Sequence, residues 1–138
     1  MARTFRLQIV TPERVLIDGP ATSVVAPGVT GSFGVLAGHA PLVAELAVGE
    51  LRYRDESGTE HFMALHGGFL QVTGDRTTVL ADAAERPEEI DVERARRAQE
   101  RAREEQRRLA ERYNAQDEAR IRAALERALN RLRLAGRS

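Results

Sequence analysis

Cysteine and lysine are both absent from the 138 residues, and long hydrophobic runs are absent as well. Without cysteine the chain can form neither a disulfide framework nor a thiolate-ligated metal site, which fits a reducing cytosolic compartment. No run approaches the roughly 18–20 apolar residues that span a bilayer, and the first residues lack the apolar core of a signal peptide. These absences predict a soluble protein whose association with a membrane depends on partners.

All 21 basic residues are arginines, and the two halves of the chain differ in charge. Residues 1–84 hold six arginines and nine acidic residues, a net charge of −3, whereas residues 85–138 hold fifteen and twelve, a net charge of +3. Arginine is the better fork-shaped partner for phosphates and carboxylates. Two explanations stay open, namely the codon usage of a GC-rich or thermophilic genome and a functional demand for anion binding.

The first 84 residues have the pattern of a β domain. Near the N-terminus Phe5, Leu7 and Ile9 alternate with more polar residues, so they share one face of a strand. Turn signals rich in glycine recur at short spacing, and the clearest is the Asp-Glu-Ser-Gly segment at residues 55–58 between two alternating runs. Short strands between frequent turns predict an antiparallel sandwich or barrel over residues 1–84.

The composition changes near Glu85, and residues 85–138 have the pattern of two helices. Residues 91–134 contain neither glycine nor proline, and the strong helix formers alanine, arginine, glutamate and leucine dominate. Asp91 is placed to cap the first helix. The only weak stretch is Tyr113-Asn114-Ala115-Gln116, so we expect a turn there and two antiparallel helices. Favourable i,i+4 pairs are expected on their surfaces: Glu93–Arg97, Glu104–Arg108 and Glu118–Arg122.

The apolar stripes of these two helices are thin and consist mostly of alanine. They comprise Ala95, Ala98, Ala102 and Leu109 in the first helix, and Ile121, Leu125, Ala128, Leu132 and Ala135 in the second. Such a seam buries little area, so it stabilises the helix pair weakly. Two interpretations stay open: the helices separate while remaining helical, as a switch, or the hairpin stays permanently docked on the β domain.

No set of residues in the sequence supports catalysis. The glycine-rich segment 31–39 lacks the Gly-Lys-Ser/Thr of a phosphate loop, and no serine lies in a nucleophile elbow. His39, His61 and His66 are not accompanied by a metal-binding His-Glu-x-x-His pattern. The helices are nearly as acidic as basic and hold a single aromatic residue, which disfavours nucleic-acid binding. We therefore expect no enzyme activity, no metal and no nucleic-acid partner.

One group of arginines favours binding of a polyanion. Arg127 and Arg131 are one helical turn apart and have no acidic residue at i±3 or i±4. Arg94 and Arg101 share nearly one face of the first helix, and pairing about the expected turn places Arg101 across from about residue 128. A phosphate chain would relieve the repulsion between these guanidinium groups. The alternative is that they point into solvent or pair with acids on the β domain.

Four blocks in order along the chain resemble the epsilon subunit of F-type ATP synthases: Val10–Glu13, Gly31–Leu42, Gly67–Val72 and Leu80–Arg86. The resemblance implies a ten-stranded antiparallel β-sandwich (residues 1–84) followed by an α-helical hairpin (residues 85–138). It also implies a non-catalytic subunit at the foot of the central stalk, which couples proton flow to ATP synthesis. There the sandwich would bind the gamma subunit and the c-ring, peripherally on the cytoplasmic face of the bacterial plasma membrane.

The resemblance further implies that the hairpin regulates the complex. It would extend along gamma toward the alpha and beta subunits and inhibit ATP hydrolysis, with candidate basic contacts at Arg122, Arg127, Arg131 and Arg133. Without the family in view, the alternative is a β-sandwich adaptor whose helical hairpin binds a coiled-coil partner.

Some members of the family bind ATP on the folded hairpin through an Ile/Leu-Asp-x-x-Arg-Ala pattern, which residues 90–95 contain. No cofactor is required, and ATP is expected as a regulatory ligand that favours the compact hairpin. The resemblance implies this set of contacts: Glu85, Ile90, Asp91, Arg94, Ala95, Arg101, Arg127 and Arg131.

Overall fold

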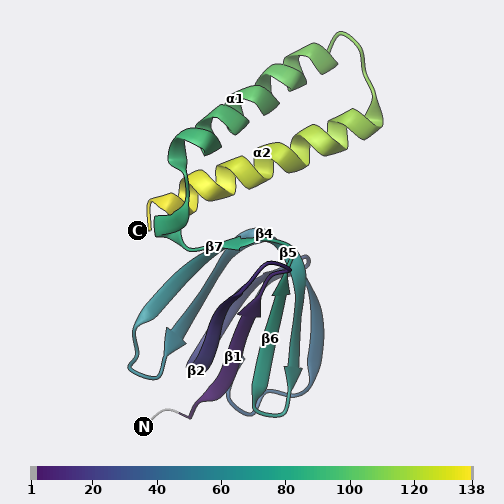
Figure 1. Cartoon of the computed structure of the whole chain (residues 1–138). Helices are drawn as coiled ribbons and strands as arrows, with labels where there is room; N and C mark the ends of the chain where they lie inside the picture. The colour runs from purple at the N-terminus through teal and green to yellow at the C-terminus, as the bar shows by residue number, and fades with distance from the viewer. Residues whose placement is uncertain (1–2, 138) are drawn as a thin grey trace. The chain divides into compact units, whose positions relative to one another are not determined.

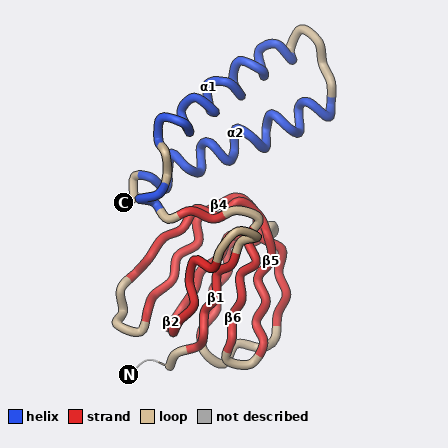
Figure 2. The backbone as a smooth tube through the Cα atoms, in the orientation of Figure 1, coloured by secondary structure: helices blue, strands red, loops and turns tan. Residues whose placement is uncertain are grey.

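The computed structural model describes residues 3–137 and divides the chain into two compact units, with the boundary between Arg86 and Pro87 (Figure 1). The first unit contains only strands and connecting loops, and the second contains the helices, as the red and blue segments of Figure 2 show. The unit boundary lies two residues after the one expected from the change in composition. The β domain followed by two helices is confirmed.

Seven strands lie within the described part of the first unit, and they form one sheet that closes on itself. The order is β1-β6-β5-β4-β2-β3, with β1 also pairing with β2 and β7 pairing with β5. Only the β1–β6 pairing is parallel among these strands. The strand bounds are β1 Phe5–Val10, β2 Val15–Gly28, β3 Gly31–Leu36, β4 Leu42–Asp55, β5 Glu60–Thr73, β6 Arg76–Ala81 and β7 Ala84–Glu85.

The expected count of ten strands is not matched, because three of the seven strands are long. β2, β4 and β5 each run for 14 residues, and each pairs with different neighbours along its length. The first part of β2 pairs with β1 and its last part with β3, and its pairing with β4 shifts register twice. Each long strand therefore takes the place of two shorter strands in a barrel-like sandwich.

The interior of the β unit is filled by the alternating residues that the sequence indicates. Phe5, Leu7 and Ile9 are 4%, 0% and 0% exposed, so the face predicted for the first strand is the buried one. The predicted hairpin is also present, since β4 ends at Asp55 and β5 begins at Glu60. The other fully buried large side chains of this core are Leu51, Met63, Leu65, Leu70, Val24, Val35 and Val79.

The second unit consists of a short 3-10 helix (Pro87–Glu89), α1 (Val92–Leu109) and α2 (Ala115–Ala135). Asp91 caps α1 as expected, because its Oδ1 accepts a hydrogen bond of 3.1 Å from the Arg94 amide. Asn114 caps α2, and its Oδ1 accepts from the amides of Gln116 and Asp117 at 2.9 and 3.2 Å. The turn therefore spans residues 110–114, which is earlier than the expected 113–116.

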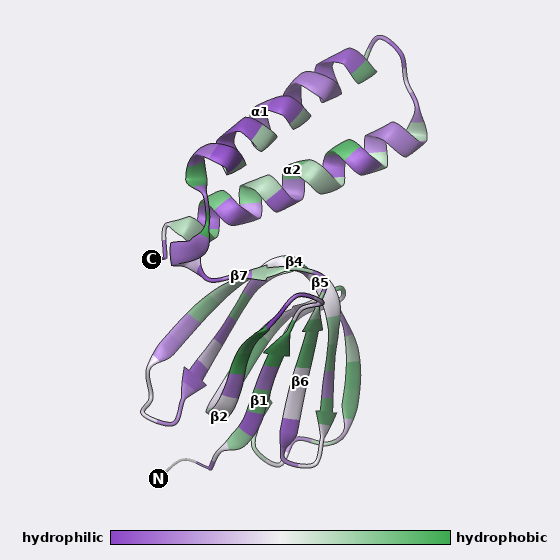
Figure 3. Ribbon diagram, in the orientation of Figure 1, coloured by the Kyte–Doolittle hydropathy of each residue, from purple (hydrophilic) through white to green (hydrophobic). Residues whose placement is uncertain are grey.

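The seam between the helices is as thin as the sequence predicts. Ala95 and Ala102 of α1 are each 3% exposed, and Ile121 and Ala128 of α2 are 3% and 1% exposed. Figure 3 shows α1 as mostly hydrophilic along its length, with few hydrophobic positions. Neither described helix is long and apolar enough to cross a membrane.

Candidate functional site

The start of α1 contains the Ile-Asp-x-x-Arg-Ala pattern, and most of its members have structural roles. Ile90 is 8% exposed and Ala95 is 3% exposed, so both are packing residues. The Asp91 carboxylate caps the helix through the Arg94 amide. The guanidinium of Arg94 is exposed and has no hydrogen-bond or ion-pair partner among residues 3–137. Within this pattern, Arg94 alone offers a charged group that the hairpin itself does not use.

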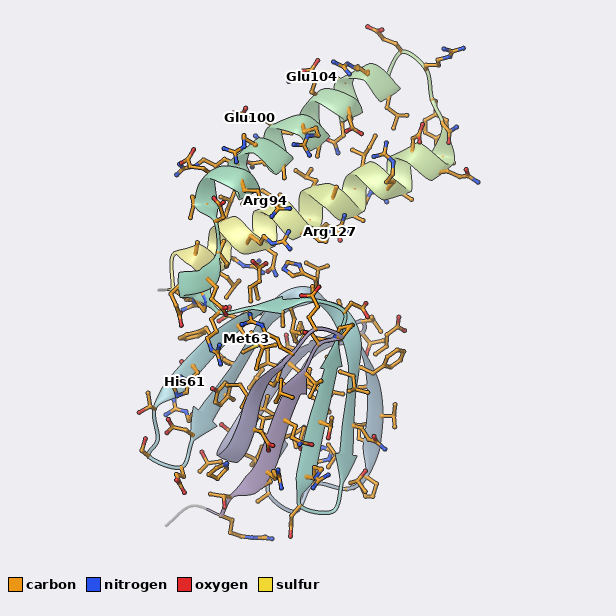
Figure 4. All side chains as sticks on the ribbon, in the orientation of Figure 1. His61, Met63, Arg94, Glu100, Glu104 and Arg127 are labelled. Atoms are coloured by element: carbon orange, nitrogen blue, oxygen red, sulfur yellow. The ribbon has the colours of Figure 1, made fainter. Side chains whose placement is uncertain are left out.

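Two further candidate arginines resemble Arg94. The side chains of Arg101 on α1 and Arg127 on α2 are exposed, and neither makes an ion pair within the described residues. Figure 4 shows Arg94 and Arg127 on different helices, both in the half of the hairpin away from the connecting turn. Arg103 is likewise exposed and without a partner in the described chain, so this property alone does not define a site. Arg94, Arg101 and Arg127 differ from Arg103 in their position relative to the opposite helix.

The register of the two helices comes from a salt bridge between them. Arg120 Nη2 lies 3.0 Å from Glu105 Oε2, so position 105 of α1 faces position 120 of α2. In an antiparallel pair this places Arg94 across from Arg131, and about residue 124 across from Arg101. The expectation that Arg101 faces about residue 128 is therefore wrong by one helical turn. Its cause is the earlier position of the connecting turn.

This register gathers positive charge in the half of the hairpin that holds the start of α1 and the end of α2, which we call the base. Arg94 and Arg131 lie at about the same level of the two helices, and Arg127 precedes Arg131 by one turn. Guanidinium groups bind phosphate oxygens through paired N–H donors. The base of the hairpin is thus suited to a polyanion.

Glu85 belongs to the β unit, so the eight candidate nucleotide contacts are divided between the two units. It lies in β7, where its Oε1 is 3.6 Å from Nε2 of His66 on β5. Both ring nitrogens of His66 are buried and make no hydrogen bond within the described residues. The local surroundings of Glu85 thus include a histidine, while the other seven candidates lie in the helical unit.

The candidate inhibitory arginines differ in how they are engaged within the hairpin. Arg122 pairs with Glu118 at 2.6 Å, as the sequence predicts for an i,i+4 pair. Arg133 donates to Oδ1 of Asn130 at 2.5 Å, and Arg131 is half-buried. Arg127 is exposed and unpaired within residues 3–137. Among these four, Arg127 is thus the most available to a partner.

The expected surface pairs on α1 are only partly realised. Glu93 pairs with Arg96 at 2.6 Å and not with Arg97, since an i,i+3 neighbour lies within reach as well. Glu104 contacts Arg108 at 3.9 Å but is held more closely by Arg107. The adjacent Arg107 guanidinium lowers the pKa of Glu104 below its usual value.

The histidines lie in separate surroundings, and residues 3–137 contain no cluster of three or more side chains that could hold a metal ion. His61 Nε2 is 2.8 Å from Asp55 Oδ2, and its ring stacks on Tyr53 with centroids 4.8 Å apart. The hydrogen bond from His61, followed by that from Ser57, lowers the pKa of Asp55 well below its usual range. His39 instead lies beside the Ala40 carbonyl, at 2.6 Å. The His61–Asp55 pair closes the β4–β5 turn.

An exposed apolar surface on the β unit was not indicated by any motif. Phe69 on β5 and Leu80 on β6 are direct cross-strand partners, and each is 53% exposed. Val43 on β4, 68% exposed, is opposite Gln71 and diagonal to Phe69 on the same face. We call Val43, Phe69 and Leu80 the apolar face. Large side chains that share one exposed face of a sheet mark an interaction surface more often than isolated ones do.

The glycine pair before Phe69 shapes this face. Gly67 and Gly68 have φ values of +87° and +129°, which side-chain-bearing residues rarely adopt. A Cβ on Gly68 would overlap the Leu80 carbonyl oxygen and lie 2.8 Å from Ala81 Cα. Residue 68 must therefore be glycine for β5 and β6 to pair here. The sequence signal for the apolar face is the run Phe69-Leu70, which puts apolar side chains on both sides of one strand.

The two units match two adjoining family descriptions. Residues 4–87 match the β-sandwich domain of the ATP synthase delta/epsilon chain, and residues 88–136 match its long α-helix domain. The ATP synthase epsilon chain of Moorella thermoacetica is 50% identical over 133 residues, which are 96% of this chain and 97% of that protein. The ATP synthase epsilon chain of Carboxydothermus hydrogenoformans is 58% identical over 104 residues, 75% and 77% of the two chains.

Solved structures give the same picture of the fold. A chain in the cryo-EM structure of the Euglena gracilis mitochondrial ATP synthase (OSCP/F1/c-ring) has a TM-score of 0.76 and 26% identity, over 89% of this chain and 76% of that one. A chain in the central stalk/c-ring structure of the Tetrahymena thermophila mitochondrial ATP synthase has a TM-score of 0.57 at 12% identity, which is a likeness of fold alone. It covers 99% of this chain and 96% of that one.

Proposed function

The chain belongs to the ATP synthase delta/epsilon chain family as a non-catalytic epsilon subunit, and we propose that it is a rotor-stalk subunit that regulates its complex. In this role the β unit binds the gamma subunit and the c-ring, and the hairpin controls ATP hydrolysis. Binding to the complex holds the chain at the cytoplasmic face of the bacterial plasma membrane, where proton flow is coupled to ATP synthesis.

The observation that supports docking of the β unit most directly is the apolar face. Phe69, Leu80 and Val43 share one exposed sheet surface, and the glycine pair before Phe69 allows β6 to approach β5 closely there. Burying an exposed side chain of this size contributes about 1.5–3 kcal/mol to association when it is fully covered. The apolar face thus offers enough area to anchor a partner, and we assign that partner as the gamma subunit.

A charge placed in the apolar face tests this assignment. We expect Phe69→Glu to weaken binding to the gamma subunit of the same complex by 10-fold or more, because a buried carboxylate would remain unpaired. Val15→Glu is the matched control, since Val15 is 60% exposed and lies outside the face. Binding is measured by calorimetry or by surface-immobilised gamma. Equal losses in the two variants would show that the apolar face is not the docking surface.

The regulatory part of the proposal concerns the hairpin. ATP binds the compact hairpin through the guanidinium groups of Arg94, Arg101, Arg127 and Arg131, and it does not bind the extended form. Support comes from the arginines at the base and from the side chains of Arg94, Arg101 and Arg127, which have no partner within residues 3–137. A ligand shifts a conformational equilibrium only by its difference in affinity for the two states. High ATP then favours the compact, non-inhibitory state.

Substitution of single arginines tests the nucleotide site. We expect Arg94→Ala and Arg127→Ala each to weaken ATP binding about 10-fold or more, because hydrogen bonds to a charged group contribute about 1.5–3 kcal/mol. Arg103→Ala is the control, as Arg103 is equally exposed and unpaired in the described chain but lies outside the set. Isothermal titration calorimetry measures the affinities. Unchanged binding in both test variants would place the site elsewhere.

When ATP is low, we propose that the hairpin opens and α2 extends along gamma toward the alpha and beta subunits. Its basic residues Arg122, Arg127, Arg131 and Arg133 then meet acidic surfaces of the catalytic subunits and inhibit hydrolysis. The thin alanine seam supports this, since it makes separation of the helices cheap while each helix keeps its own hydrogen bonds. ATP hydrolysis by the reassembled complex, with wild-type chain and with a chain truncated after residue 110, measures the inhibition. Equal rates would contradict it.

A further inference from the structure

Ion pairs in the described hairpin include pairs within one helix and a pair that joins the two helices. Arg96–Glu93 and Arg122–Glu118, both at 2.6 Å, are internal to α1 and α2. Arg120 of α2 and Glu105 of α1 are 3.0 Å apart and bridge the seam. A pair within one helix survives when the helices separate, whereas a bridging pair is lost. Glu105–Arg120 therefore contributes to the free-energy difference between the closed and the open hairpin.

The bridging pair lies near the connecting turn, at the end of the hairpin that we call the tip. There the Tyr113 hydroxyl donates to Glu118 Oε2 at 2.7 Å, and Glu118 Oε1 accepts from Arg122 at 2.6 Å. These two contacts hold the turn to α2 alone. The attachment of α1 to α2 at the tip thus relies on Glu105–Arg120 and on a few apolar contacts around Ile121.

We propose that Glu105 and Arg120 form a clasp that favours closure of the tip of the hairpin without nucleotide. The regulatory meaning of the clasp rests on the proposed function, but its effect on closure does not.

The expected size of the effect follows from the exposure of the pair. The Arg120 and Glu105 side chains are 61% and 29% exposed, so solvent screens the interaction strongly. Exposed ion pairs of this kind change an equilibrium constant by about 1.5- to 5-fold. Arg120 also lies 3.9 Å from Asp117 within α2, an interaction that opening leaves intact. The clasp contribution should shrink as salt rises, because exposed charges are screened within about 10 Å at 0.1 M salt.

A thiol placed in the seam measures opening directly. The chain lacks cysteine, so Ala102→Cys introduces a single thiol at a position that is 3% exposed. Such a thiol reacts with a maleimide or disulfide reagent only when the helices separate, and the rate relative to the unfolded chain gives the opening constant. The rate is measured without nucleotide for Arg120→Gln, Glu105→Gln and the double variant. Arg107→Gln is the control, because Arg107 pairs with Glu104 within α1.

The clasp predicts a specific pattern of rates. Arg120→Gln and Glu105→Gln should each raise the labelling rate about 1.5- to 5-fold. The double variant should react no faster than the faster single variant, because the same interaction is lost once. Arg107→Gln should change the rate less than either. Equal rates for Arg120→Gln and Arg107→Gln, or effects that multiply in the double variant, would overturn the proposal.

Two additional measurements keep the test decisive. If Ala102→Cys lowers the helical content in circular dichroism, the same series is run with Ala95→Cys, another seam position that is 3% exposed. Adding ATP to the wild-type background then tests the nucleotide site separately: slower labelling supports it, and an unchanged rate contradicts it. The clasp is judged only from the nucleotide-free rates, so either proposal can fail while the other stands.

Discussion

A side chain at position 68 would collide with β6, so substitution of Gly68 should lower the free energy of unfolding of the β unit. In Gly68→Ala the new Cβ would overlap the Leu80 carbonyl oxygen and lie 2.8 Å from Ala81 Cα, at a backbone φ of +129°. The φ strain costs about 1–3 kcal/mol. Relief of the overlap requires β5 and β6 to move apart around the Gly68–Ala81 pair, which weakens about one or two hydrogen bonds at about 1 kcal/mol each. We expect a total loss of about 2–5 kcal/mol.

Gly58→Ala is the matched control for this substitution. Gly58 also has a positive φ, +86°, but a Cβ there meets nothing within 4 Å. The control therefore carries the backbone strain without the overlap and should cost about 1–2 kcal/mol. The difference between the two variants isolates the close approach of β6 to β5.

Urea denaturation followed by tyrosine fluorescence is a suitable assay, because the chain has two tyrosines and no tryptophan. In a Tyr113→Phe background the signal comes from Tyr53, which is 8% exposed in the β unit. Linear extrapolation gives the free energy of unfolding for Gly68→Ala and Gly58→Ala. Losses that agree within about 0.5 kcal/mol would refute the reasoning that residue 68 must be glycine because of β6.

Three further predictions concern local contacts. The lowered pKa of Asp55 means that its ionised form stabilises the β4–β5 turn. The free energy of unfolding of wild type should therefore exceed that of Asp55→Asn by a constant amount above about pH 4, and the difference should fall as pH drops below it. Denaturation at pH 7, 5 and 3 measures this difference. Asn114→Ala should remove the cap of α2 and cost about 1 kcal/mol, seen in the thermal transition at 222 nm. Ile121→Ala should cost about 2–5 kcal/mol in the same helical transition and leave the unfolding signal of Tyr53 unchanged.

Much of the fold is predictable from the sequence because local pattern and tertiary position agree. The alternation of Phe5, Leu7 and Ile9 is the buried face of β1, and Asp91 begins α1 as its side chain suggests. The strand count was less predictable, since glycines and prolines that normally end strands occur inside β2. Gly19 and Pro20 lie within that 14-residue strand, where Pro20 pairs with Arg6 of β1. A turn signal and a bend inside a long strand look alike in sequence.

The connecting turn lies earlier than the sequence predicts for a related reason. Ala110-Glu111-Arg112 are good helix formers, yet the helix tightens there, because the amides of Glu111 and Arg112 bond to Arg108 and Leu109 with three-residue spacing. Asn114 was the better signal, since asparagine is a preferred cap. A second helix that begins after Asn114 shifts the predicted pairing of the helices by one turn, and it changes the residue expected opposite Arg101.

The surroundings of the candidate nucleotide residues were predictable only in part. The sequence correctly isolates Arg127 as an arginine without an acidic neighbour in its own helix, and it remains unpaired within the described residues. It could not separate Arg94 from Asp91 and Ala95, whose roles in capping and packing are visible only in the folded chain. The apolar face could not be predicted from the sequence. Val43, Phe69 and Leu80 are far apart in sequence, and only the strand register brings them together.

The distribution of contacts in the two units bears on which part of the chain can move. In the β unit β1 pairs with both β2 and β6, so opening that sheet would break long-range pairings throughout the unit. In the hairpin the helices keep their backbone hydrogen bonds whether or not they touch, and a thin seam and the Glu105–Arg120 bridge oppose their separation. The hairpin is therefore the part of the chain that can open at the lower cost in free energy.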